Sequence, residues 1–124
     1  DCVMAVFRNQ FHLDRAIDCA LNIRKKIESL PKELDYAPKV AIGINSVEMI
    51  SGNIGSATLR RLDYTVIGDV VNTAQRLQTA AGPGQIMINE TSYENIKDSF
   101  NCERVGEVKL KNKTNPVIIY NVLD

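Results

Sequence analysis

Two polar residues one helical turn apart, Asn72 and Arg76, are the side chains in this sequence best suited to chemistry. They follow DYTVIGD at 63–69, where β-branched residues lead into a Gly-Asp pair. Residues four apart project from the same side of a helix. An amide and a guanidinium held together suit an oxyanion or a phosphate. A solvated polar face is the alternative interpretation of the same spacing.

The helix that carries this pair is predicted over 70–81 and ends before Gly82-Pro83-Gly84. Gly68 is expected to form a tight turn after a strand at 63–67, and Asp69 to cap the helix. At about 100° per residue, one narrow arc forms the core face. It consists of Val70, Ala74, Leu77 and Ala81. The pair lies opposite this arc and is predicted to reach a ligand or a partner chain.

Other kinds of chemical site are weakly supported by the sequence. The glycines at 52, 55 and 68 form neither a Walker loop, because no GK[ST] follows, nor a dinucleotide fingerprint. His12 is the only histidine and opens a helix, and no Ser-His or Cys-His pair stands out. Metal-ligand spacing is also absent, so these residues favour turns and packing over catalysis.

Composition narrows the class of protein. The 124 residues suit one domain, and 15 basic residues balance 15 acidic ones, which argues against a nucleic-acid partner. The three cysteines at 2, 19 and 102 form no paired motif and are interpreted as free thiols in a reducing compartment, so we expect a cytoplasmic location. No apolar run is long enough to cross a membrane, and we expect no membrane contact from this segment.

The hydrophobic patterns predict one α+β domain over 1–124, with helices packed on a mixed, largely antiparallel sheet. The predicted strands are 2–7, 39–46, 48–55, 63–67, 85–89, 102–111 and 116–123. The predicted helices are 12–30, 70–81 and 91–100, the last capped by Thr91 or Ser92. The chain begins without Met and in the middle of a strand pattern, so we expect an N-terminally truncated fragment.

Several linked stretches, in order along the whole chain, resemble the catalytic domain of class III nucleotide cyclases, the adenylate and guanylate cyclases. The stretches are DCVMAVF, VAIGINS, SGNIGS, RLDYTVIGDVVNTAQRL, GPGQIMINETSYENI and VGEVKLKNKTNPVIIYNV. RLDYTVIGDVVNTAQRL, similar to RxDYTVIGDxVNxAxRL, is the most specific. The resemblance implies a ferredoxin-like cyclase domain of which this chain holds the C-terminal two-thirds.

The resemblance also implies a reaction: a nucleoside triphosphate becomes a 3′,5′-cyclic monophosphate and pyrophosphate, with two Mg²⁺ or Mn²⁺ ions held by two aspartates. Asp1 matches the second of these metal aspartates. Asn72 matches the residue that orients the ribose, and Arg76 the one that stabilises charge on the α-phosphate. The family's sites lie between two subunits, so the resemblance implies a homodimer.

Substrate residues follow from the same resemblance. Thr65 matches the base-reading position and favours ATP, while Arg61 and Lys111 match positions near the nucleotide. Guanylate cyclase activity and a catalytically dead regulatory or dimerisation module stay open as alternatives.

The sequence departs from the family pattern at two glycines and at its beginning. Val47 and Asn112 replace turn glycines, and Val47 predicts a hairpin turn of different shape. The first metal aspartate and the lysine that pairs with Thr65 lie upstream of this sequence. We therefore expect the fragment alone to be inactive.

Overall fold

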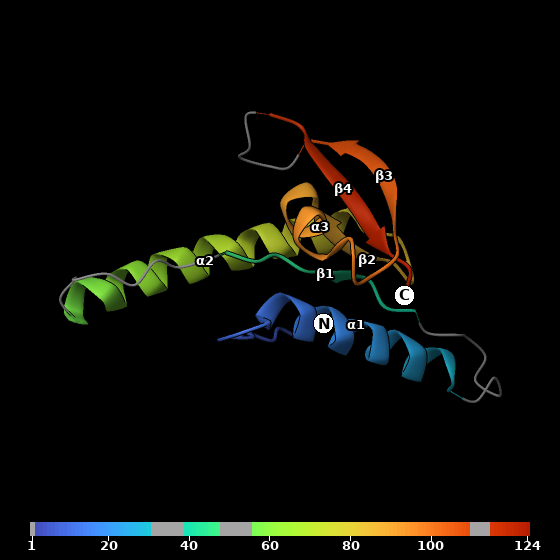
Figure 1. Cartoon of the computed structure of the whole chain (residues 1–124), viewed down its shortest axis with the longest axis horizontal. Coiled ribbons are helices and arrows are strands. Elements are labelled where there is room, and N and C mark those ends of the chain that lie inside the picture. Colours follow the sequence, from blue (N-terminus) through green and yellow to red (C-terminus); the bar gives the residue numbers. More distant parts are fainter. Residues whose placement is uncertain (1, 31–38, 48–55, 110–114) are drawn as a thin grey trace.

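In the part of the chain that the structure describes, a mixed sheet of four strands packs with three helices, which confirms the predicted α+β class (Figure 1). The computed structural model describes residues 2–30, 39–109 except 48–55, and 115–124, without the side chains of 56–67. The helices are α1 (His12–Glu28), α2 (Ser56–Ala80) and α3 (Glu90–Ile96). The strands are β1 (Ile42–Gly43), β2 (Ile86–Asn89), β3 (Cys102–Val108) and β4 (Val117–Val122). The sheet order is β1-β2-β4-β3, with β1 parallel to β2 and the other pairs antiparallel.

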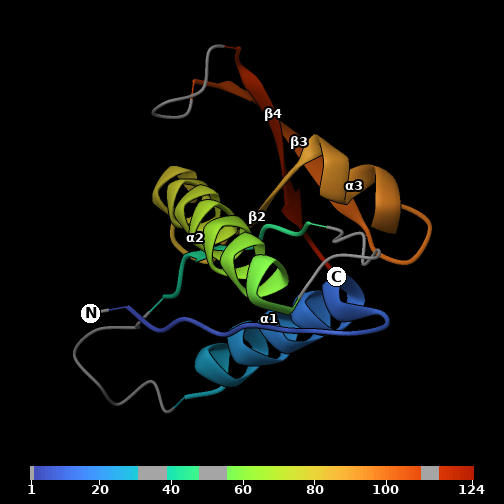
Figure 2. The ribbon, with the colours of Figure 1, turned by 90° about the vertical axis from the view of Figure 1, so that its left-hand side faces the viewer.

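The alternation of side chains along β2 divides the core into two clusters. Ile86 and Ile88 pack with residues of α1 and α3, whereas Met87 packs with Leu77 of α2. Successive residues of a strand point to opposite faces of the sheet. The sheet therefore lies between α2 on one face and α1 and α3 on the other, as Figure 2 shows for α2 and α3.

Helix α1 begins at the predicted residue and ends two residues before the predicted boundary. Leu13, Ile17 and Ala20 are buried on one side of the helix. From the last turns of the same helix, the guanidinium of Arg24 donates to the backbone carbonyl oxygens of Val122, at 2.9 Å, and of Leu123. This arginine ties α1 to the end of β4.

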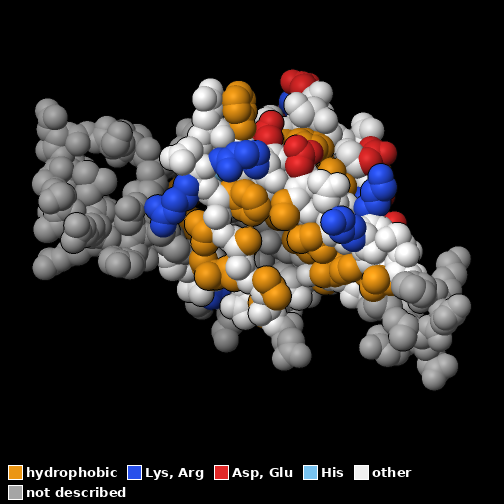
Figure 3. All heavy atoms as spheres, turned by 90° about the horizontal axis from the view of Figure 1, so that it is seen from below, with side chains coloured by type: hydrophobic (Ala, Val, Ile, Leu, Met, Phe, Trp, Pro, Cys, Tyr) orange, Lys and Arg blue, Asp and Glu red, His pale blue; other side chains and the backbone are white. Residues whose placement is uncertain are grey.

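The prediction of a buried strand at 2–7 is wrong in this structure. The segment has no regular structure, and all of its apolar side chains except the half-buried Phe7 are exposed, with Val3 at 96% and Met4 at 64%. Its β-branched composition favours a strand only where a partner strand supplies hydrogen bonds, and none of the described strands pairs with it. Figure 3, viewed from the side on which α1 lies, shows hydrophobic side chains gathered across the middle of that face.

The predicted strand at 63–67 is also wrong: these residues belong to α2, which runs without interruption through Gly68 and Asp69. Asp69 is therefore inside the helix and does not cap it. Helix-forming Leu and Arg residues precede this stretch at 59–62, and one exposed glycine costs a helix only about 1 kcal/mol. The first half of α2 extends beyond the sheet (Figure 1). The strand predicted at 48–55 lies outside the described residues.

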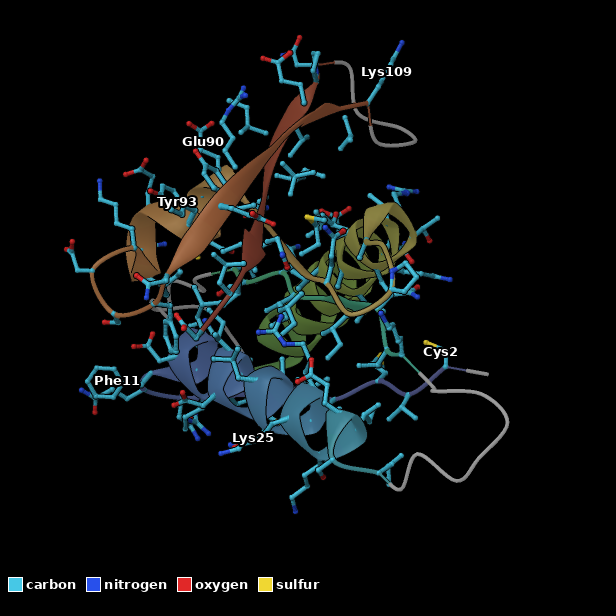
Figure 4. All side chains as sticks on the ribbon, turned by 90° about the vertical axis from the view of Figure 1, so that its right-hand side faces the viewer. Cys2, Phe11, Lys25, Glu90, Tyr93 and Lys109 are labelled. Carbon is cyan, nitrogen blue, oxygen red and sulfur yellow. The ribbon has the colours of Figure 1, made fainter. Side chains whose placement is uncertain are left out.

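The C-terminal part follows the prediction closely. Strand β2, helix α3 and the hairpin of β3 and β4 all form. The predicted cap of α3, Thr91 or Ser92, is wrong: the cap is Asn89, whose side chain accepts from the backbone N–H of Ser92 at 3.0 Å. The rings of Tyr93 and Tyr120 stack with centroids 3.8 Å apart, joining α3 to β4. Figure 4 shows Glu90 and Tyr93 on α3, near the hairpin.

Two expectations about the whole chain can be compared with the structure. All three cysteines are free thiols, as predicted. Among the described residues, no helix is long and apolar enough to cross a bilayer.

Candidate active site

Helix α2 presents Asn72 and Arg76 on the side away from its buried residues. Thr73 and Leu77 are buried, at 6% and 0% exposure, whereas Asn72 is exposed and Arg76 is half-buried. The predicted core arc is confirmed at Leu77, which packs against Met87 and Ile119. No ion pair between described residues includes Arg76. The pair is thus open to a molecule that approaches α2 from outside.

Strand β1 holds the opposite side of α2 through an unusually close contact at Gly43. A Cβ atom added to Gly43 would lie 2.2 Å from the carbonyl oxygen of Ala74 and 2.3 Å from the backbone nitrogen of Gln78. Only glycine permits so close an approach of two backbones. The sequence pattern did not reveal this role, because the contact joins residues 31 positions apart.

Two residues further along, Asn45 fixes the same strand to α2 and to β2. Its side-chain Nδ2 donates to the carbonyl oxygen of Val70 at 3.3 Å, and its Oδ1 accepts from Nδ2 of Asn89 at 3.2 Å. Asn89 in turn caps α3 through Ser92. These bonds form a continuous chain from α2 through the ends of β1 and β2 to α3.

Ser46 is joined to α1 by a pair that the sequence pattern did not indicate. Nε2 of His12 lies 2.6 Å from Oγ of Ser46, and Nδ1 lies 3.2 Å from the carbonyl oxygen of Asn9. That carbonyl can only accept, so in the neutral imidazole Nδ1 carries the proton and Nε2 accepts from the serine hydroxyl. The pair did not stand out in the sequence because its members are 34 positions apart, and in the structure it fastens the segment after β1 to the start of α1.

A cleft of about 580 Å³ opens beside these bonds, between α2, the ends of β1 and β2, and the β3–β4 hairpin. Its described lining includes three carboxylates, Asp69, Glu90 and Glu107, and no Lys or Arg. A triphosphate would meet only like charge there. The cleft also excludes Asn72 and Arg76 from its lining, so it is separate from the anion site expected on α2.

The remaining predicted site residues fall largely outside the description. Arg61 and Thr65 lie in α2, at positions whose side chains are not described, and Asp1 and Lys111 lie outside the described residues. Within the described ranges, no three His, Cys, Asp or Glu residues gather as a metal site would require. The described residues by themselves therefore do not form a metal centre, and the metal role of Asp1 stays a prediction.

Comparison with known proteins places these features in a family. Residues 1–123 match the family described as Adenylate and Guanylate cyclase catalytic domain. A guanylate cyclase of Toxoplasma gondii is 37% identical over 103 residues, which make up 81% of this chain and 2% of that protein. Soluble guanylate cyclase 89Db of Drosophila melanogaster is 35% identical over 108 residues, 85% of this chain and 15% of that protein. An adenylate cyclase of Mycobacterium tuberculosis is 29% identical over 102 residues, 82% of this chain and 22% of that protein.

Solved structures of low identity share the fold. The catalytic core of a rhodopsin-guanylyl cyclase with converted specificity, in complex with ATPαS, gives a TM-score of 0.67 at 23% identity and covers 92% of this chain and 60% of that one. An adenylate/guanylate cyclase/hydrolase from Silicibacter pomeroyi gives 0.62 at 24% identity, covering 90% of this chain and 63% of that one. The chain thus spans less than two thirds of each of these relatives. With the family pattern matched over nearly all of its length, the chain belongs to the adenylate and guanylate cyclase catalytic domain family.

Proposed function

We propose that the natural protein containing this chain is an adenylate cyclase, which converts ATP to 3′,5′-cyclic AMP and pyrophosphate. The observation that carries the proposal is the pair Asn72 and Arg76 on the outward side of α2, in a chain of the nucleotide cyclase family. In the reaction, the ribose 3′-oxygen attacks the α-phosphorus, and the bond from that phosphorus to the bridging oxygen of pyrophosphate breaks.

Each residue of the pair has a distinct task in this proposal. The amide of Asn72 holds the ribose so that its 3′-oxygen faces the α-phosphate, and positioning of this kind lowers the entropic part of the barrier. The guanidinium of Arg76 donates hydrogen bonds to the oxygens on which charge grows in the transition state. By analogy with a lost oxyanion-hole donor, removing Arg76 should raise the barrier by roughly 2.7–4 kcal/mol.

The choice of ATP rests on Thr65, and Arg61 and Lys111 are proposed to contact the nucleotide. Guanylate cyclase activity is the second candidate, and a specific observation favours it: two relatives that exceed 30% identity over most of this chain are named guanylate cyclases. The base-reading position must therefore be tested with both nucleotides.

Divalent ions and a second copy of the chain complete the proposal. Mg²⁺ or Mn²⁺, bound in part by Asp1, would neutralise phosphate charge and favour the 3′-oxygen as nucleophile. A homodimer would bring the outward side of α2 against a partner, and exposed apolar residues such as Val3 and Met4 offer it contact area. One of the similar folds is described as a non-canonical dimeric guanylyl cyclase domain, from Blastocladiella emersonii.

The test is a cyclase assay on the full natural protein with Mn²⁺ and either ATP or GTP, beside Arg76→Ala and Arg76→Lys. We expect cyclic AMP from ATP and a fall in kcat of about 100- to 1,000-fold in Arg76→Ala. Arg76→Lys keeps the charge without the forked donor and should recover only part of the rate. Cyclic GMP alone would establish the second candidate, and no product from a folded dimer would favour a regulatory module.

A further inference from the structure

We infer that Asn45 is a positioning residue for the cyclase reaction: its two side-chain hydrogen bonds set the rotation of α2 about its own axis and thereby the place of Arg76. This inference rests on the proposed function of Arg76. Asn45 touches neither Asn72 nor Arg76, and its partners are the Val70 carbonyl and the Asn89 amide. Asn45 therefore acts through the helix that carries the pair and is not itself a catalytic residue.

The contacts that hold α2 all lie on one side of it. At 100° per residue, Val70, Ala74 and Gln78 fall within about 80° of each other around the helix. Gly43 meets Ala74 and Gln78, and Asn45 meets Val70. Strand β1 therefore runs along α2 in the opposite sense and contacts more than one turn of it.

These two contacts differ in what they control. The contact at Gly43 is one of backbone against backbone, which sets how close β1 comes to α2. The bond from Asn45 is directional, because its donor must point at one carbonyl oxygen. A rotation of α2 turns the Val70 carbonyl away from the line of this donor, whereas the non-directional contact at Gly43 has no preferred angle, so the bond of Asn45 resists rotation more strongly.

The position of Arg76 must be held precisely for the proposed reaction, because small rotations of α2 displace its side chain. A group at the outer radius of a helix, about 6 Å from its axis, moves by about 1 Å when the helix rotates by about 10°. A displacement of about 1 Å between a catalytic group and its substrate can lower the rate about 100-fold. Arg76 lies about 120° around α2 from Val70 at 100° per residue, and a small rotation therefore displaces its guanidinium from a substrate bound against this side of the helix.

Asn89 gives the bond its own support. Its Nδ2 donates to Oδ1 of Asn45, which fixes the orientation of the Asn45 amide so that Nδ2 of Asn45 faces Val70. Its Oδ1 is engaged at the N-terminus of α3, where it accepts from Ser92. This chain of hydrogen bonds is thereby anchored at both ends, at the cap of α3 and at the Val70 carbonyl of α2.

The experiment compares two conservative substitutions in the full natural protein. Asn45→Asp keeps an acceptor for Asn89 but replaces the donor to Val70 with an oxygen that repels the carbonyl. Asn89→Asp keeps the cap of α3, since aspartate caps as well as asparagine, but loses the donor to Asn45. Asn121→Ala is the control, because Asn121 also bridges elements with a buried amide, from the Ile86 N–H at 3.0 Å to Glu103 at 3.0 Å, and neither of these bonds is made to α2.

We expect kcat to fall about 10- to 100-fold in Asn45→Asp, with KM for the nucleotide changed less than threefold. Asn89→Asp should give a smaller fall, because Asn89 acts on Val70 only through Asn45. Asn121→Ala should lower the melting temperature while leaving kcat within twofold. Hydrogen exchange of the amides at 68–80 should be faster in Asn45→Asp and unchanged in Asn121→Ala.

The outcomes separate this inference from the proposed function. If Arg76→Ala loses activity while Asn45→Asp keeps kcat and leaves exchange at 68–80 unchanged, the positioning role is wrong and the function stands. If Asn121→Ala lowers kcat as much as Asn45→Asp does, the effect of Asn45 is only one of stability and the role is also wrong. If the wild-type protein makes no cyclic nucleotide, the proposed function fails, and unchanged exchange in Asn45→Asp would then overturn the anchoring as well.

Discussion

Replacing Gly43 with alanine tests the close approach of β1 to α2. The new Cβ would lie 2.2 Å from the Ala74 carbonyl oxygen, whereas ordinary contact begins at 3.4 Å. The two backbones must therefore separate by about 1.2 Å along the line of contact, the difference between these two distances. Both atoms nearest to the new Cβ belong to the backbone of a helix, so no side-chain rotation relieves the clash.

Separation at this point also opens the cluster of Leu77, Met87 and Ile119, which lies between α2 and the sheet. Overpacking of this kind costs about 1–3 kcal/mol, and the rigid neighbours place Gly43→Ala at the upper end, about 3 kcal/mol. A loss of that size should lower the melting temperature by about 10 °C. Native-state hydrogen exchange of the β2 amides measures the free energy of unfolding directly.

Gly68→Ala is the matched control for this prediction, because a Cβ at Gly68 meets nothing within 4 Å. In a continuous α2, alanine at this position should raise the free energy of unfolding by up to about 1 kcal/mol. A free energy of unfolding in Gly43→Ala within about 0.5 kcal/mol of the wild type would refute the close approach. A marked loss in Gly68→Ala would instead support the turn that the sequence predicted there.

Two further predictions concern other parts of the molecule. Burial raises the pKa of the Cys102 thiol, so at pH 8 this thiol should react with iodoacetamide more slowly than the exposed Cys2. The rate at Cys102 should climb as the pH passes 9. Mass spectrometry of the two peptides measures both rates, and equal rates would contradict the prediction. Arg24→Ala should free the end of β4 from α1, so that proteolysis near the C-terminus becomes faster. Arg24→Lys should keep part of the protection. Unchanged cleavage in Arg24→Ala would show that the bonds of Arg24 do not hold β4 to α1.

Local patterns in the sequence predicted the elements that depend on their own residues. Helix α1, the short strand β2 and the hairpin of β3 and β4 all form near their predicted bounds. The outward direction of Asn72 also followed from helical periodicity alone, since the same helix buries Leu77 on its other side.

The errors arise where structure depends on a distant partner. Residues 2–7 and 63–67 have the composition of strands, yet a strand forms only where another strand pairs with it, and that pairing is not encoded locally. The contact of Gly43 with Ala74, the bond of Asn45 to Val70 and the pair of His12 with Ser46 each join residues more than 20 positions apart. A single sequence shows the residue types but does not show which distant residues come into contact.

The alternation of β2 has a consequence for how this domain can diverge. Met87 and Ile88 are neighbours in the chain, yet they belong to separate clusters on opposite faces of the sheet. Substitutions at the two positions share few partners, so their effects on stability should nearly add. The face that carries α2 can therefore accumulate changes that shift the helix holding Asn72 and Arg76, while the face that carries α1 and α3 keeps the domain folded.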